Sequence, residues 1–198
     1  VYKRQAMKVA KKYGKGYQDM NFIVAHLGGG VSLNVHEKGR IVDIVSDDEG
    51  PFSPERAGRV PCRDLIDLCF SGKYNKKTMQ KKLRGNGGLR AYLKTVDARE
   101  VEKMIKNGDE EARIIYEAMA YQVAKGIGEL ATVVDGEVDA IILTGGIAYS
   151  YMMVSWIKKR VKFIAPVEVM PGENEMESLA HGTLRVLKGE ETAREYFE

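Results

Sequence analysis

The chain has 198 residues, with 31 lysines and arginines against 28 acidic residues, a formal net charge of +3 and 44% hydrophobic residues. This length and composition are typical of a globular protein with one substantial core. No apolar run approaches the ~18 residues of a membrane span. The basic residues are scattered apart from Lys73–Lys82, which we expect to be a solvated helix face, so neither a membrane nor a nucleic acid is indicated as a partner.

The beginning of the chain predicts a helix that is already under way. Residues 1–14 place apolar side chains on one side and stop at Gly14, a suitable C-cap. The first residue is Val1 rather than methionine, so we expect a piece of a longer protein. No signal peptide is recognisable, and Cys62 and Cys69 lack a metal-ligand spacing. Buried free thiols and a cytoplasmic location are therefore expected.

The stretch 21–36 predicts two strands joined by glycines. Phe22–Ala25 is an apolar run ended by His26, and apolar and polar residues alternate from Val31 to His36. After a turn, Arg40–Ser46 is predicted to form a third strand.

Gly28, Gly29 and Gly30 need a physical reason, because each glycine costs backbone entropy. One interpretation is a hairpin turn with positive φ angles, for which one or two glycines would suffice. The other is a loop whose exposed backbone N–H groups bind phosphate oxygens. The residues alone leave both open, but the Walker pattern is excluded because no Gly-Lys-Ser/Thr follows.

The segment 47–61 contains two glycines and three prolines, so regular structure is not expected there. Its acidic residues and arginines suit the wall of an active site, although an exposed charged loop is the alternative. Pro61 is predicted to start a helix that reaches Gly72. A short helix capped by Asn75 follows, and then a flexible turn at 85–89.

Two further helices are predicted in the middle of the chain. Asp97-Ala-Arg-Glu100 has the pattern of a capping box, with Asp97 as N-cap. The stretch 110–135 carries apolar residues at helical spacing and is the longest predicted helix. Gly126 and Gly128 inside it cost about 1 kcal/mol each relative to alanine, so we expect them to allow close packing.

The last third predicts strands alternating with helices. Ala140–Leu143 is a buried strand that runs into Thr144-Gly145-Gly146, with a helix starting near Ala148. A strand, a glycine turn and a helix N-terminus suit a phosphate or ribose. Val167–Met170 is the last strand. The acids of 173–177 either complement a helix dipole or anchor Mg²⁺.

The resulting order is three antiparallel strands, helices, then strand, helix, strand, helix. This order predicts an α/β fold of the actin-like ATPase (ribonuclease H-like) type, with a five-stranded mixed sheet and helices on both faces.

Separated motifs along nearly the whole chain resemble the butyrate kinase branch of the acetate kinase family. They are His26-Leu-Gly-Gly-Gly30, Glu49-Gly-Pro-Phe-Ser-Pro-Glu-Arg-Ala-Gly58, Leu68-Cys-Phe-Ser-Gly-Lys-Tyr74, Gly87-Gly-Leu89, Leu143-Thr-Gly-Gly-Ile147 and Pro171-Gly-Glu-Asn-Glu175. The match is to the C-terminal half of that family alone. It implies that residues 1–198 are a C-terminal nucleotide-binding domain whose N-terminal actin-like partner domain is absent here.

The resemblance implies transfer of the γ-phosphoryl group of ATP to a short-chain carboxylate such as butyrate, with Mg²⁺ as cofactor, and the reverse reaction with ADP. It assigns catalysis to His26 and Arg56 and the metal to Glu175. The nucleotide would be bound by Gly28, Gly29, Gly30, Asp97, Arg99, Gly145, Gly146, Ile147 and Ala148.

The chain departs from the family pattern at four positions. Gly29 stands where acetate kinases have asparagine, Ala98 replaces an aromatic residue, and Tyr149 and Ser150 replace a Glu-Asn pair. From local sequence alone, a core histidine is the preferred interpretation of His26, and the helix cap is preferred to a ligand role for Asp97. The implied partners are the small carboxylate, the missing domain and further copies of the protein. The alternatives are a kinase for acetate, propionate or a branched acid, and a non-catalytic actin-like module.

Overall fold

The computed structural model describes residues 1–172 and 175–193, and for Glu175 the backbone alone. Its centre is a five-stranded sheet in the order β3-β2-β1-β4-β5. The strands are β1 (Phe22–Leu27), β2 (Val31–Glu37), β3 (Arg40–Val45), β4 (Ala140–Gly145) and β5 (Val167–Pro171). β1, β2 and β3 pair antiparallel, whereas β4 and β5 run parallel to β1, as the sequence predicts.

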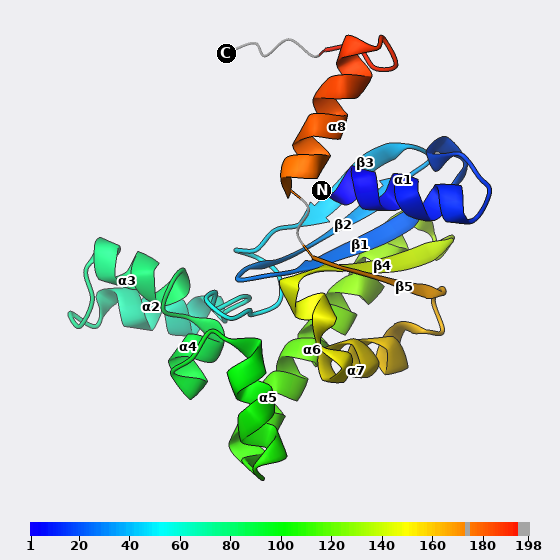
Figure 1. Ribbon diagram of the computed structural model, residues 1–198. Helices are drawn as coiled ribbons and strands as arrows, with labels where there is room; N and C mark the ends of the chain where they lie inside the picture. The colour runs from blue at the N-terminus through cyan, green and yellow to red at the C-terminus, as the bar shows by residue number, and fades with distance from the viewer. Residues whose placement is uncertain (173–174, 194–198) are drawn as a thin grey trace.

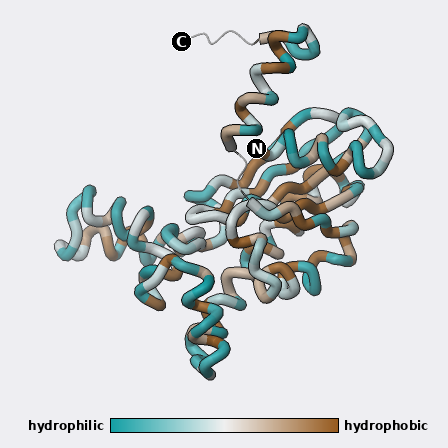
Figure 2. Tube along the Cα trace, in the orientation of Figure 1, coloured by the Kyte–Doolittle hydropathy of each residue, from teal (hydrophilic) through white to brown (hydrophobic). Residues whose placement is uncertain are grey.

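Helices cover both faces of this sheet (Figure 1). On one face, α1 (Tyr2–Lys12) packs Ala6 and Val9 into a small core with Phe22 and Ile142. On the other face, α6 (Glu110–Ala131) and α7 (Tyr151–Val161) form the main core with the opposite sides of the same strands. Figure 2 shows hydrophobic residues concentrated in the strands and on the helix sides that face them.

The chain between β3 and α6 leaves the sheet and forms an extension at one side of the molecule (Figure 1). Its helices are α2 (Cys62–Phe70), α3 (Lys76–Leu83), α4 (Gly88–Leu93) and α5 (Ala98–Lys106). The last helix, α8 (Glu175–Leu187), projects from the α1 side of the sheet. In the part of the chain that the structure describes, no helix is both long and apolar enough to cross a bilayer.

Several local expectations are wrong in this extension. The thiols of Cys62 and Cys69 are exposed rather than buried, because α2 buries none of its residues. The expected turn at 85–89 contains the start of α4. Asp97 caps α5 as predicted, but Glu100 bonds to Thr95 instead of closing a capping box.

The two glycines of α6 differ. A Cβ at Gly126 would lie 3.1 Å from Leu33 Cδ1, so this glycine does allow the helix to approach β2. A Cβ at Gly128 would meet nothing within 4 Å, so the expected close packing is absent at Gly128.

Candidate nucleotide site

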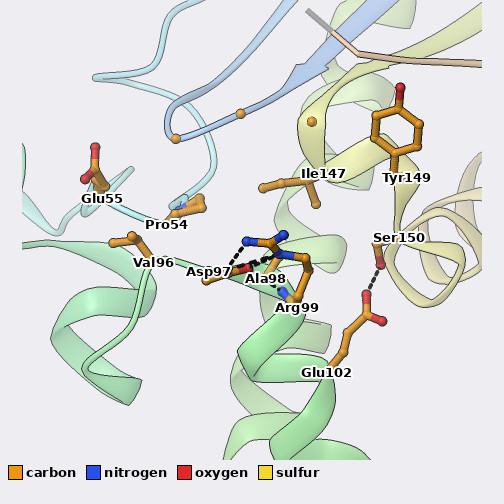
Figure 3. A pocket seen from close by; sticks show the side chains of 13 residues that line it. Pro54, Glu55, Val96, Asp97, Ala98, Arg99, Glu102, Ile147, Tyr149 and Ser150 are labelled. Carbon is orange, nitrogen blue, oxygen red and sulfur yellow. Dashed lines mark hydrogen bonds and ion pairs between the residues drawn. The ribbon is translucent and has the colours of Figure 1, made fainter.

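A cavity of about 750 Å³ opens where the ends of β1 and β4 meet the start of α5. Its size lies within the range usual for small-molecule sites. Figure 3 shows that the labelled side chains come from three separate places in the chain, namely residues 54–55, residues 96–102 and residues 147–150. The described residues that line it are Gly28, Gly29, Pro54, Glu55, Val96, Asp97, Ala98, Arg99, Glu102, Gly146, Ile147, Tyr149 and Ser150.

Backbone conformation does not explain the three glycines of the loop after β1, whereas contact with Asp47 restricts the space at Gly30. None of Gly28, Gly29 and Gly30 has a positive φ, so the hairpin interpretation does not explain them. A Cβ at Gly30 would lie 2.9 Å from Asp47 Oδ2, and one at Gly29 would lie 3.5 Å from Glu55 Oε2. The loop is therefore packed against the charged segment 47–61 on one side and open to the cavity on the other.

Ser53 fixes the glycine loop to this charged segment. Its buried hydroxyl donates to the Gly29 carbonyl oxygen at 2.8 Å, and the Glu55 N–H donates to the same oxygen at 3.2 Å. The Arg56 N–H in turn donates to Ser53 Oγ at 3.1 Å. Sequence reasoning missed Ser53, because its partner lies 24 residues earlier in the chain.

The second glycine loop begins at Gly145, the last residue of β4. Gly145 has a φ of +92°, and a Cβ there would lie only 2.4 Å from the Leu27 carbonyl oxygen. The two strand ends therefore touch, which brings both glycine loops to one edge of the sheet. Gly146 faces open space, since a Cβ there would meet nothing within 4 Å. A 3₁₀ turn at Gly146–Tyr149 follows, and the expected helix starts at Tyr151 instead of near Ala148.

Asp97 and Arg99 form a tight ion pair at the start of α5. The Arg99 guanidinium donates to both Asp97 oxygens, at 2.9 Å and 3.1 Å from Nε and 2.6 Å from Nη2. Asp97 also accepts from the Arg99 backbone N–H at 2.9 Å, which caps the helix. The side-chain hydrogen bond from Arg99 lowers the pKa of Asp97 to about 2. Asp97 thus combines the capping role with a place in the cavity wall.

Of the predicted nucleotide-binding residues, the cavity brings together Gly28, Gly29, Asp97, Arg99, Gly146 and Ile147. Gly30, Gly145 and Ala148 lie in the same two loops but do not line it. The predicted catalytic residue His26 does not line the cavity. A Cβ at Gly28 would lie 3.3 Å from its Nε2, and its ring lies 6.0 Å from that of Tyr2. The Glu175 side chain lies outside the described residues, so its predicted metal role stays a prediction.

Arg56 does not line the cavity but lies beside it in a network of ion pairs. Its Nε is 3.1 Å from Asp47 Oδ2, and its Nη1 is 3.6 Å from Glu55 Oε2. Arg84 also pairs with Asp47, and Arg90 pairs with Glu55. The predicted catalytic guanidinium therefore adjoins the first glycine loop through Glu55, while its side chain is held by carboxylates.

Seven of the described lining residues were not predicted as binding residues, and two of these, Glu102 and Ser150, are hydrogen-bonded to each other. Glu102 follows Arg99 by one helical turn, and its carboxylate accepts a hydrogen bond from the Ser150 hydroxyl. Residues three apart lie on the same helix face, so the position of Arg99 could have indicated Glu102. Ser150 joins α5 to the N-terminus of α7, where it also caps the helix.

A model described as the acetokinase family matches residues 2–181 of the sequence. The chain belongs to this family. It is 52% identical over 196 residues to butyrate kinase 2 of Clostridium acetobutylicum, and the match covers 98% of this chain but 55% of that protein. The chain therefore spans about half the length of this curated relative. The resemblance inferred from the motifs is confirmed.

Solved structures of acetokinase type share the fold. The acetate kinase of Porphyromonas gingivalis superposes with a TM-score of 0.85 at 22% identity, over 92% of this chain and 53% of that one. A propionate kinase of Francisella tularensis gives 0.79 at 21% identity, over 88% and 51%. At this identity the likeness shows the fold alone, and it confirms the predicted actin-like ATPase architecture.

Proposed function

We propose that the chain is the nucleotide-binding C-terminal domain of a butyrate kinase, which transfers the γ-phosphoryl group of ATP to butyrate and catalyses the reverse reaction. The single observation that carries the proposal is that one cavity joins both glycine loops with the Asp97–Arg99 pair. Similarity to a butyrate kinase at 52% identity supports butyrate as the acid.

The cavity suits a nucleoside diphosphate or triphosphate. Gly29 and Gly146 present backbone without side chains, so phosphate oxygens can approach the chain closely there, whereas the Gly28 N–H already donates to the Gly30 carbonyl oxygen at 3.0 Å. The 3₁₀ turn begins at Gly146 and α7 begins directly after Ser150, so both N-termini, which favour negative charge, start at lining residues of the cavity. Phosphoryl transfer depends on such positioning and on electrostatic stabilisation more than on a protein nucleophile.

Mg²⁺ is the cofactor that this chemistry implies. Proteins bind it through one or two carboxylates together with substrate phosphates, so the donor set on the protein can be small. Glu55 lies beside the glycine loop, and Glu175 is the glutamate that the family motif indicates. Within residues 1–172 and 176–193, three or more His, Cys, Asp or Glu side chains do not gather as a metal site. When bound, Mg²⁺ would neutralise charge on the phosphates.

The rest of the proposal concerns parts outside this chain. We assign the carboxylate pocket to a cleft shared with an N-terminal domain, because the chain spans 55% of its butyrate kinase relative. The isolated chain should then bind nucleotide but make little acyl phosphate. A cytoplasmic, homo-oligomeric enzyme is part of the same proposal.

Two measurements test this function. Calorimetric titration of the chain with Mg·ADP should show binding, and the full-length protein should form a hydroxamate-trapped acyl phosphate from ATP and butyrate faster than from acetate, propionate or isobutyrate. Preference for another acid would replace butyrate by that acid. Absence of acyl phosphate with every acid would favour a non-catalytic actin-like module.

Arg56→Ala separates catalysis from binding. If Arg56 acts on the phosphoryl group in flight, the variant should lose turnover by a factor on the order of 10³ while ADP binding changes little. Arg84→Ala is the matched control, because Arg84 shares the Asp47 carboxylate with Arg56. Equal losses in the two variants would assign Arg56 to the ion-pair network alone.

A further inference from the structure

Glu102 differs from the other acidic residues of the cavity wall. Asp97 is paired with Arg99, and Glu55 lies within reach of Arg56 and Arg90. Glu102 belongs to none of the ion pairs among the described residues. Figure 3 shows it on the far side of the cavity from Glu55, the carboxylate that adjoins Gly29. Glu102 therefore lies away from the Gly28–Gly29 end of the cavity.

Ser150 holds the Glu102 carboxylate in place. The Ser150 hydroxyl donates to Glu102 Oε1. The same hydroxyl oxygen accepts from the Met153 N–H at 2.9 Å and from the Tyr116 hydroxyl at 3.4 Å. One donor and two acceptor sites are all that a serine hydroxyl has, so its single hydrogen is committed to Glu102. The Glu102 carboxylate is thus oriented by Ser150, at the start of α7, whose hydroxyl makes all the hydrogen bonds that it can make.

The chemistry of a carboxylate restricts what it can meet in a bound nucleotide. An ionised carboxylate only accepts hydrogen bonds, and phosphate oxygens also only accept, so the two repel. The nucleoside half supplies neutral donors, namely the ribose hydroxyls and the exocyclic amine of the base. With the phosphates at the glycine loops, the nucleoside half extends toward Glu102.

On the basis of the function proposed above, we propose that Glu102, positioned by Ser150, accepts a hydrogen bond from the nucleoside part of the nucleotide and helps to select which nucleotide the cavity binds. The donor to Glu102 is either a ribose hydroxyl or the exocyclic amine of the base. Ligands that lack one or the other distinguish them.

The test is calorimetric titration of the 198-residue chain with four ligands: ADP, 2′-deoxy-ADP, 3′-deoxy-ADP and IDP, which lacks the amine. Glu102→Gln keeps the bond from Ser150 through its amide oxygen and turns a donor toward the ligand. The variant should bind ADP ~10-fold more weakly, the usual effect of losing a hydrogen bond to a charged group. Glu111→Gln, an exposed glutamate on α6, is the charge-matched control and should bind ADP like the wild type.

The ligand series identifies the donor. The analogue that lacks the donor group should bind the wild type ~10-fold more weakly than ADP does. The Glu102→Gln variant should bind that analogue and ADP with equal affinity. Ser150→Ala should reduce the same selectivity, and Ser150→Thr, which keeps the hydroxyl, should restore it. Loss of the helix cap alone would weaken all four ligands equally.

Two results overturn the inference. If ADP binds the wild type and Glu102→Gln equally well, Glu102 does not contact the nucleotide, and the proposed function stands. If all four ligands keep the same affinity ratios in both proteins, Glu102 does not determine selectivity. Failure of ADP to bind the wild type at all is a different outcome, since it removes the proposed function together with this inference.

Discussion

Gly145 and Gly146 are adjacent in the chain but lie in opposite surroundings, so alanine at each position tests the geometry of the site. Gly145 has a φ of +92°, and a Cβ there would lie 2.4 Å from the carbonyl oxygen and 2.7 Å from the carbonyl carbon of Leu27. These are backbone atoms of β1, which cannot rotate aside. At Gly146 a Cβ would meet nothing within 4 Å, and its φ is not positive.

The expected magnitudes follow from these contacts. A side chain in a left-handed conformation costs roughly 1–2 kcal/mol, and forcing packed backbone apart adds a further ~1–3 kcal/mol. Gly145→Ala should therefore lower the free energy of unfolding by about 2–5 kcal/mol. Gly146→Ala should change it by less than about 0.5 kcal/mol, as is usual where no contact is disturbed.

Urea unfolding followed by circular dichroism measures the stability of both variants, and titration with Mg·ADP measures their affinity for the nucleotide. Gly146→Ala should keep the wild-type unfolding midpoint but bind ADP about tenfold more weakly, because its methyl group enters the cavity wall. A wild-type midpoint for Gly145→Ala would mean that the ends of β1 and β4 are not in contact. Undiminished ADP affinity in Gly146→Ala would remove the second glycine loop from the nucleotide site.

Three further predictions concern stability and charge. Burial lowers the pKa of His36 from its ordinary value of 6.5 to about 4. As the pH falls below 6.5, His36 is therefore protonated in the unfolded chain but stays neutral in the folded protein, which favours unfolding. Between pH 7.5 and 5 the wild type should lose about 2 kcal/mol of unfolding free energy that His36→Gln does not lose, as measured by urea unfolding at each pH. Gly128→Ala should raise the urea midpoint, with a gain of about 0.5–1 kcal/mol, because a Cβ there is unobstructed; an unchanged midpoint would contradict this. Arg99→Ala removes the side-chain bond that depresses the pKa of Asp97, so NMR titration should find that pKa raised toward 3.8.

The sheet and its covering helices could be predicted because their buried apolar residues recur at the spacing of a strand or a helix. Phe22 and Ile23 point to opposite faces, and each belongs to a core on its own side of the sheet. The start of α4 could not be predicted in this way. A Cβ at Gly88 would lie 1.6 Å from the Ser53 carbonyl oxygen, so this glycine is required by a distant contact. Locally, such a glycine cannot be distinguished from one in a flexible turn.

In the site, too, features set by the local sequence were predicted and features set by distant contacts were not. Both glycine loops were predicted because each carries its own chemistry, a strand end followed by exposed backbone. The surroundings of Arg56 were not predicted, since its pairing with Asp47 and Glu55 depends on the path of an irregular loop. Glu102 and Ser150 were missed for a related reason, because their bond joins two helices 48 residues apart.

The charge of the cavity wall limits what these residues can do alone. The described lining residues include the carboxylates of Glu55, Asp97 and Glu102 but one guanidinium, that of Arg99, which Asp97 already holds. A polyphosphate adds more negative charge, and phosphoryl transfer requires cations where that charge is redistributed. Arg56 is itself paired with two carboxylates beside the cavity. Under the proposed function, Mg²⁺ and an N-terminal domain would supply the positive charge that the described lining residues lack.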